Sequence, residues 1–280
     1  MKMIITFVLG LGSAYGLWTL LQPLFAKPIF QRENYRGRRL PTAAGLVLVL
    51  APLPWIALWS AYDAIRDGSR PDLDRSWTTT VIVVVGFGLF GLLDDLVGDG
   101  GPRGFAGHVV AATRGELTTG MIKLVGGGLV AVAAAAPWAA DRFSHLVIGA
   151  LTIALAANLG NLFDRAPGRI EKVSLLGFAV LAVATLGDDG LAGPALVVGA
   201  GAAMLVPDLR EKCMLGDTGA NVLGAAVGLG VVASTDTSAQ AAVAIVLLVL
   251  NVVSEFVSFS SVIERTPPLR WADRLGALPR

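Results

Sequence analysis

Apolar stretches long enough to cross a lipid bilayer follow one another along most of this chain. Residues 3–26 contain no charged side chain, and a helix that rises about 1.5 Å per residue needs about 20 residues to span the hydrocarbon core. The other apolar stretches cover residues 43–61, 78–93, 119–137, 144–159, 173–187, 190–206, 216–233 and 240–261. The pattern predicts an all-α fold, a polytopic membrane helical bundle of about nine transmembrane helices.

The composition supports this class and limits the others. The chain of 280 residues is 54% hydrophobic and only 15% charged, with a mean hydropathy of +0.68. Because no stretch is left for a separate soluble domain, we expect residues 1–280 to form one integral membrane domain. The formal net charge of +1 gives no electrostatic case for nucleic-acid binding. The single cysteine, Cys213, excludes an internal disulfide.

The distribution of basic residues predicts the orientation of the helices. Only Lys2 precedes the first apolar stretch, and the basic residues that follow it are Lys27, Arg32, Arg36, Arg38 and Arg39. This order argues against a signal peptide and places the N-terminus outside. With that orientation, 17 of the 22 Lys and Arg residues lie on the inner side, as the positive-inside rule requires. The basic tail, residues 262–280, is then cytoplasmic.

Two adjacent carboxylates end the third apolar stretch. Asp94 and Asp95 follow Leu92 and Leu93 at the inner membrane surface, and they point about 100° apart on a helix. One acid can therefore bind a metal while the other binds a proton or a substrate. The alternative is that the acids only terminate the apolar stretch. In the following loop, residues 96–118, we expect a short interfacial helix.

A second polar cluster ends the fifth apolar stretch. Asn158, Asn161 and Asp164 recur every third residue, which lines them along one side of a helix that tightens toward 3-10 geometry. Carboxamides and a carboxylate in this arrangement can hydrogen-bond a ribose, a sugar or a phosphate, and the alternative is capping of the helix end. The Pro and Gly that follow predict a loop. Arg165 and Arg169 offer donors suited to phosphate, although positive-inside anchoring explains them equally well.

The third polar cluster is Gly216-Asp217-Thr218-Gly219, which opens the eighth apolar stretch. Asp217 can bind Mg²⁺ there, and the amides at the helix start can help to hold a pyrophosphate. The alternative is that Asp217 or Thr218 caps those amides. Mg²⁺, or Mn²⁺, fits better than Zn²⁺ because the three clusters are rich in oxygen ligands while Cys213 is solitary.

A few ionisable residues lie elsewhere. Lys123 is about one turn inside the fourth stretch, where it either contacts a phosphate or extends to the membrane surface. Glu255 is expected about two turns inside the ninth stretch and to need a partner, with Asn251 on the same face. His108 has no second His with which to form a ligand pair, and His145 falls on the outer side, so neither is expected to take part.

In this order, the three clusters resemble those of the polyprenyl-phosphate N-acetylhexosamine-1-phosphate transferases, and the likeness covers residues 27–264. That family has an Asp-Asp pair at a helix end, an Asn-x-x-Asn-x-x-Asp-Gly loop and a Gly-Asp-x-Gly loop. The segment Arg39-Leu40-Pro41-Thr42 is similar to a basic-x-Pro-Thr segment of the family, and Lys123 falls where the family keeps a basic residue. Two features differ: Arg165 replaces the family's Gly, and no His-rich loop or tenth helix follows the ninth stretch.

The resemblance implies roles for the polar residues. Asp217 is expected to be the principal metal ligand, with Asp94 or Asp95 as second ligand or proton acceptor. Lys123 is expected to contact phosphate. The residues expected to bind nucleotide, sugar or phosphate are Asn158, Asn161, Asp164, Thr42, Arg39, Arg165 and Arg169.

The resemblance also implies a function. It is the transfer of a sugar 1-phosphate, N-acetylhexosamine 1-phosphate by analogy, from a UDP-sugar to a polyprenyl phosphate, with release of UMP. Such an enzyme depends on Mg²⁺ or Mn²⁺, works at the cytoplasmic face of the plasma membrane in cell-envelope glycan synthesis, and forms a homodimer. Two other classes stay open. A transporter or flippase is disfavoured because the acids cluster at one surface, and a catalytically inactive lipid-binding scaffold is favoured only by the missing His-rich loop.

Overall fold

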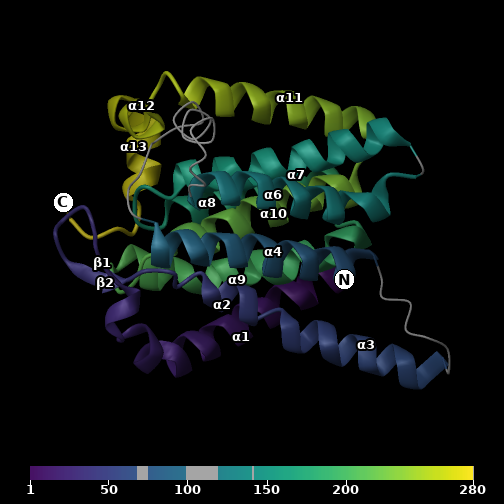
Figure 1. The fold of residues 1–280 in the computed structure, drawn as a ribbon, viewed down its shortest axis with the longest axis horizontal. Coiled ribbons are helices and arrows are strands. Elements are labelled where there is room, and N and C mark those ends of the chain that lie inside the picture. Colours follow the sequence, from purple (N-terminus) through teal and green to yellow (C-terminus); the bar gives the residue numbers. More distant parts are fainter. Residues whose placement is uncertain (68–74, 99–118, 141, 280) are drawn as a thin grey trace.

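The computed structural model describes residues 1–67, 75–98, 119–140 and 142–279, and most of this part is helical (Figure 1). The longer helices are α1 (Lys2–Phe25), α4 (Arg75–Val97), α6 (Thr119–Ala135), α7 (Phe143–Phe163), α8 (Arg169–Ala184), α9 (Ala192–Leu209), α10 (Gly216–Ser234) and α11 (Thr237–Ser254). The shorter elements are α2 (Leu46–Leu50), α3 (Leu53–Asp67), α12 (Phe259–Arg265), α13 (Pro267–Arg274), the 3-10 turns η1 (Pro28–Phe30), η2 (Ala136–Trp138) and η3 (Asp189–Leu191), and the strands β1 (Gln31–Glu33) and β2 (Arg39–Pro41).

Seven helices of the described part are long and apolar enough to cross a membrane: α1, α4, α6 with η2, α7, α9 with η3, α10 and α11. A shorter apolar helical stretch covers residues 46–62, and α8 has 16 residues. The expected class, an all-α membrane bundle, agrees with this architecture. The number of nine spans and the outside position of the N-terminus stay predictions.

The centre of the bundle is formed by α9 and α10, whose side chains are mostly buried, whereas α11 is mostly exposed. α9 packs against α1, and α10 packs against α4 and α7. Apolar residues from these helices form the main core, with Met204 and Leu223 among the fully buried side chains. α10 is surrounded by other helices, and several of these helices end near its first turn.

Two glycines allow α4 and α7 to approach the start of α10 closely. A Cβ at Gly91 in α4 would lie 2.4 Å from the carbonyl oxygen of Asp217. A Cβ at Gly160 in α7 would lie 2.5 Å from the carbonyl oxygen of Ala220. No side chain fits at such distances, so both positions require glycine if the helix backbones are to touch.

The polar clusters lie at one end of the bundle. α4, α7 and α9 end there and α6, α8 and α10 begin there, at the left of Figure 1. The β1–β2 hairpin and the helices α12 and α13 lie at the same end. The hairpin, an antiparallel pair with Arg32 opposite Leu40, was not expected in the basic loop 27–41.

Several helices begin or end away from the expected positions. The second apolar stretch is broken between α2 and α3 because Pro52 and Pro54 lack the amide that an uninterrupted helix needs. α7 continues to Phe163 instead of ending at residue 159, so the loop begins at Asp164. α11 ends at Ser254 instead of residue 261, and Ser258 then caps α12 by accepting the amide of Ser261 at 3.4 Å. The expected interfacial helix, including His108, falls largely outside the described residues.

Candidate functional site

The first turn of α10 is held by an acid from α4. One oxygen of Asp95 accepts the backbone amide of Asp217 at 2.9 Å, and the other accepts the amide of Thr218 at 3.0 Å and its hydroxyl. Gly216, with a φ of +71°, leads the chain into this turn, where a Cβ would lie 2.5 Å from the Asp95 carboxylate. Asp95 thus caps α10 from another helix, whereas capping by Asp217 or Thr218 was the alternative considered from the sequence.

Lys123 of α6 links the two other acids of the site. Its ammonium donates a hydrogen bond to the Asp217 carboxylate and lies 3.6 Å from Asp94 Oδ2. Asn161 completes the cluster. In the amide orientation that satisfies both neighbours, its nitrogen donates to Asp217 Oδ1 at 2.7 Å and its oxygen accepts from Lys123 Nζ at 2.8 Å. The structure therefore brings together four of the residues selected from the sequence, one from each of four helices.

Asp164 lies just after α7, close to the same turn of α10. Removal from water raises the pKa of its carboxyl well above the ordinary 3.8, and the negative charges of Asp208, Asp217 and Asp95 raise it further, against a hydrogen bond from the Gly216 amide. Asp164 thus belongs to the charge environment of the cluster. A protonated carboxyl here can donate as well as accept a hydrogen bond.

Asn158 and Arg169 have partners outside this cluster. Asn158 Nδ2 donates to Asn251 Oδ1 at 2.6 Å, which joins α7 to α11. Arg169 is buried, and its guanidinium binds both carboxylate oxygens of Asp273, at 2.6 and 3.0 Å. The guanidinium expected to bind phosphate is therefore occupied by a carboxylate of the C-terminal tail. Glu255, expected deep in a helix, is an exposed residue at the end of α11.

The segment Arg39–Thr42 runs beside the loop that precedes Asp217. The amide of Met214 donates to the carbonyl of Pro41 at 2.7 Å. Thr42 is buried, whereas Arg39 is exposed at the bundle end, as is Arg165. Both guanidinium groups add positive charge to the surface at this end.

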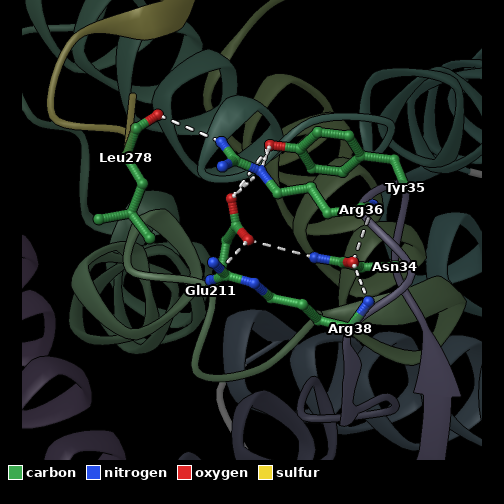
Figure 2. Close-up of polar contacts among 6 residues, drawn as sticks. All are labelled: Asn34, Tyr35, Arg36, Arg38, Glu211 and Leu278. Atoms are coloured by element: carbon green, nitrogen blue, oxygen red, sulfur yellow. Dashed lines mark hydrogen bonds and ion pairs between the residues drawn. The ribbon is translucent and has the colours of Figure 1, made fainter. Parts of the chain in front are cut away.

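Glu211 organises the basic hairpin loop, and sequence reasoning missed it (Figure 2). Its buried carboxylate lies 2.9 Å from Arg36 Nε and 3.7 Å from Arg38. It also accepts hydrogen bonds from Asn34 Nδ2 at 3.2 Å and the Tyr35 hydroxyl at 3.0 Å. The available signal was the excess of positive charge in the loop 27–41, which needs a counter-charge when the loop folds onto the protein.

A second group of acids lies buried between α8 and α9. Glu171 is fully buried, and in the described part of the chain neither carboxylate oxygen has a hydrogen-bond partner. Asp208, also buried, accepts the amide of Gly168. Burial and the charges of Asp208, Glu171 and Asp164 raise the pKa of the Cys213 thiol well above 9.0, which disfavours the thiolate. Nothing in the spacing of these residues predicted their proximity.

The donor set fits a divalent cation that is shared with a substrate. Among the described residues, no group of three or more His, Cys, Asp or Glu is placed to hold a metal by itself. Mg²⁺, however, is commonly held by one or two carboxylates together with substrate phosphates. Asp94 and Asp217 supply two such carboxylates, and both face the positive charge of Lys123.

A cavity of about 200 Å³ lies near the loop that follows Asp164. Its walls are Tyr35, Ala166, Pro167, Asp273, Arg274, Ala277, Leu278 and Pro279. The hairpin, the loop after α7 and the C-terminal tail therefore meet around one small hollow at the bundle end.

The chain matches no protein-family model and no curated protein sequence. The contacts among Asp94, Lys123, Asn161 and Asp217 are therefore the main basis for a functional proposal.

Proposed function

We propose that this protein transfers a sugar 1-phosphate, N-acetylhexosamine 1-phosphate in the first instance, from a UDP-sugar to a polyprenyl phosphate. UMP is released, and a polyprenyl diphosphate sugar is formed for cell-envelope glycan synthesis. The observation that carries the proposal is the position of Lys123 between Asp217 and Asp94. Two acids and a cation from three helices converge at one end of a membrane bundle, where a lipid phosphate and a water-soluble nucleotide can meet.

Asp217 and Asp94 are the residues that would hold Mg²⁺ or Mn²⁺. The bound ion would neutralise the pyrophosphate of the UDP-sugar, so that a second anion, the lipid phosphate, can approach it. Asn161 orients Asp217 through its hydrogen bond to Oδ1, and Asp95 fixes the backbone from which Asp217 projects. Because both Asp95 oxygens are occupied, Asp94 is the better candidate for the second ligand.

Lys123 binds phosphate in this proposal. Its ammonium already lies between two acids, and a phosphate oxygen placed there gains a charge-assisted hydrogen bond. In the reaction, an oxygen of the polyprenyl phosphate forms a bond to the β-phosphorus while the bond from that phosphorus to the UMP oxygen breaks. The electron pair of the broken bond leaves with UMP. Exposed Arg39 and Arg165 provide further positive charge for the two anionic substrates.

The location follows from the same proposal. The polar end of the bundle is the cytoplasmic face of the plasma membrane, because UDP-sugars are cytoplasmic and the basic residues concentrate at this end. Membrane lipid surrounds the bundle, and the polyprenyl chain lies among the helices. A homodimer is the expected assembly.

The experiment uses purified full-length protein in detergent with polyprenyl phosphate, Mg²⁺ and a panel of UDP-sugars. UMP release and formation of a polyprenyl diphosphate sugar are measured together. The Asp217→Ala variant should lose both, while Glu33→Gln, which changes an exposed acid of β1 at the same end, should keep both. If no sugar supports UMP release, or if Asp217→Ala releases UMP as fast as the wild type, the proposal is wrong.

A further inference from the structure

Helix α13 turns its apolar side away from the protein. Trp271 is 69% exposed, Leu275, directly after the helix, is 56% exposed, and Leu269 is 47% exposed, whereas Asp273 is only 9% exposed. An amphipathic helix on a water-soluble surface shows the opposite arrangement, with its apolar side against the core. Packing among the described residues therefore does not explain the exposed side of α13.

The polar side of α13 is attached firmly to the bundle. Asp273 forms the buried ion pair with Arg169, at 2.6 and 3.0 Å. Lys172 Nζ donates to the carbonyls of Ala272, at 3.1 Å, and Asp273, at 2.7 Å, at the C-terminal end of the helix. A cation at this end also interacts favourably with the helix dipole. These contacts fix the helix so that Trp271 and Leu275 point outward.

The exposed side of α13 extends a surface that already faces lipid. α13 lies across the end of the bundle and packs against α12, which follows α11 in the chain (Figure 1). α11 is long and apolar enough to span a membrane, and its last turns expose Val252 and Val253. Phe256, just after α11, is 84% exposed. Apolar side chains thus continue from the end of a spanning helix into the tail.

The tail also carries positive charges, which an anionic membrane surface attracts. Arg265 and Arg270 are exposed, and anionic headgroups attract basic residues near the membrane surface. Trp is the side chain most typical of the boundary between headgroups and hydrocarbon. A protein partner of α13 would have to displace lipid from a surface that is continuous with α11.

We propose that α13 is an interfacial helix, which inserts Trp271, Leu275 and Leu269 into the surface of an anionic membrane while Arg265 and Arg270 bind its headgroups. The helix lies in the plane of the membrane, with its polar side on the protein and its apolar side in lipid. Because Asp273 binds Arg169, membrane contact also holds the loop between Asp164 and Arg169 in place. The inference depends on the membrane-embedded class and not on the proposed reaction.

The test uses the full-length chain with one fluorescent label. Cys213 is the single cysteine and is buried, so a Cys213→Ala background permits labelling at chosen positions. Trp271→Cys and Leu275→Cys carry an environment-sensitive fluorophore, and the second variant keeps Trp271. Glu33→Cys, on the exposed β1 strand at the same end of the bundle, is the control. Each protein is placed in nanodiscs of phosphatidylcholine, with or without phosphatidylglycerol.

Quenching identifies what covers the label. A lipid-attached quencher should reduce the emission at positions 271 and 275 strongly, aqueous iodide should reduce it weakly, and position 33 should show the reverse. Omitting phosphatidylglycerol, or changing both Arg265 and Arg270 to Gln, should increase quenching by iodide at position 275. If iodide quenches positions 271 and 275 as strongly as position 33, the helix is not in the membrane. Protection from both quenchers would show that protein covers it instead, which also overturns the proposal.

Discussion

Asp95 Oδ1 accepts a hydrogen bond from the backbone amide of Asp217 at 2.9 Å, and the second acid of α4 thereby fixes the start of α10. Its neighbour Asp94 instead faces Lys123, at 3.6 Å. The two adjacent acids thus have different partners, as their divergence on a helix requires. Asp95 positions a residue of the site, and Asp94 remains available to a ligand.

The first prediction separates these two acids. Asp95→Ala removes the acceptor for the first amides of α10, and loss of such a cap costs about 0.5–2 kcal/mol. This variant should therefore unfold at a lower temperature and lose transferase activity. Asp94→Ala should lose activity without a comparable loss of stability. Thermal unfolding in detergent and UMP release measure the two effects, and equal destabilisation by both changes would contradict the assignment.

The second prediction concerns Lys123. A hydrogen bond to a charged group contributes about 1.5–3 kcal/mol, and each 1.36 kcal/mol corresponds to a factor of about ten in rate. Lys123→Met should therefore lower kcat/KM for the UDP-sugar by about tenfold to a hundredfold. Lys212→Met, which changes an exposed lysine at the same end, is the matched control. Similar effects of the two changes would show that Lys123 has no special role.

The third prediction is that Arg169 stabilises the folded protein and does not bind phosphate. Arg169→Gln removes the guanidinium that pairs with the buried Asp273, and breaking a buried pair in this way costs about 3–5 kcal/mol. The variant should lose stability, and the double change Arg169→Met with Asp273→Leu should recover part of it. As a control, Arg165→Gln changes an exposed arginine that lies shortly before Arg169 in the sequence. This variant should keep the unfolding temperature of the wild type. A normal unfolding temperature for Arg169→Gln, combined with a raised KM for the UDP-sugar, would instead support the phosphate-binding role expected from the sequence.

The fourth prediction is a pH dependence that arises from Asp164. Its pKa in the folded protein lies well above the ordinary 3.8 because of removal from water and the neighbouring negative charges. The folded state therefore binds this proton more tightly than the unfolded state does. The corresponding stability is fully present below pH 3.8 and is lost as the pH rises through the folded pKa.

The Asp164→Asn variant tests whether stability falls as the pH rises. The asparagine resembles the protonated acid and does not titrate, so the variant lacks this loss of stability. Unfolding measured in detergent at a series of pH values should show the wild type becoming less stable relative to Asp164→Asn as the pH rises. Parallel stability curves for the two proteins would show that the pKa of Asp164 is the same in the folded and unfolded states.

The sequence predicted the positions of polar residues correctly where these residues lie at the ends of apolar stretches. The ends of the apolar stretches placed Asp94, Lys123, Asn161 and Asp217 near one membrane surface, and the structure brings these four side chains into contact. Length and apolar composition decide where a helix enters the membrane, so residues near such ends meet even when they are far apart in the chain. Whether they bind a cation and a nucleotide stays a prediction.

Partners chosen by tertiary packing could not be predicted in this way. Arg169 was expected to bind phosphate, but Asp273 lies against it, and residues 104 positions apart leave no periodic signal. Asn158 has the same spacing as Asn161 but contacts Asn251 on α11. Glu211 was overlooked because a Glu in a polar loop is ordinarily solvated, and only the folded hairpin surrounds it with arginines.

The metal dependence of the reaction is measured by a Mg²⁺ titration of UMP release from a UDP-sugar in the presence of polyprenyl phosphate. If Asp217 and Asp94 hold the ion, the wild type needs Mg²⁺, Asp94→Asn needs a higher Mg²⁺ concentration, and Asp217→Asn is inactive at every concentration. Equal UMP release by the wild type and Asp217→Asn across the titration would contradict this assignment.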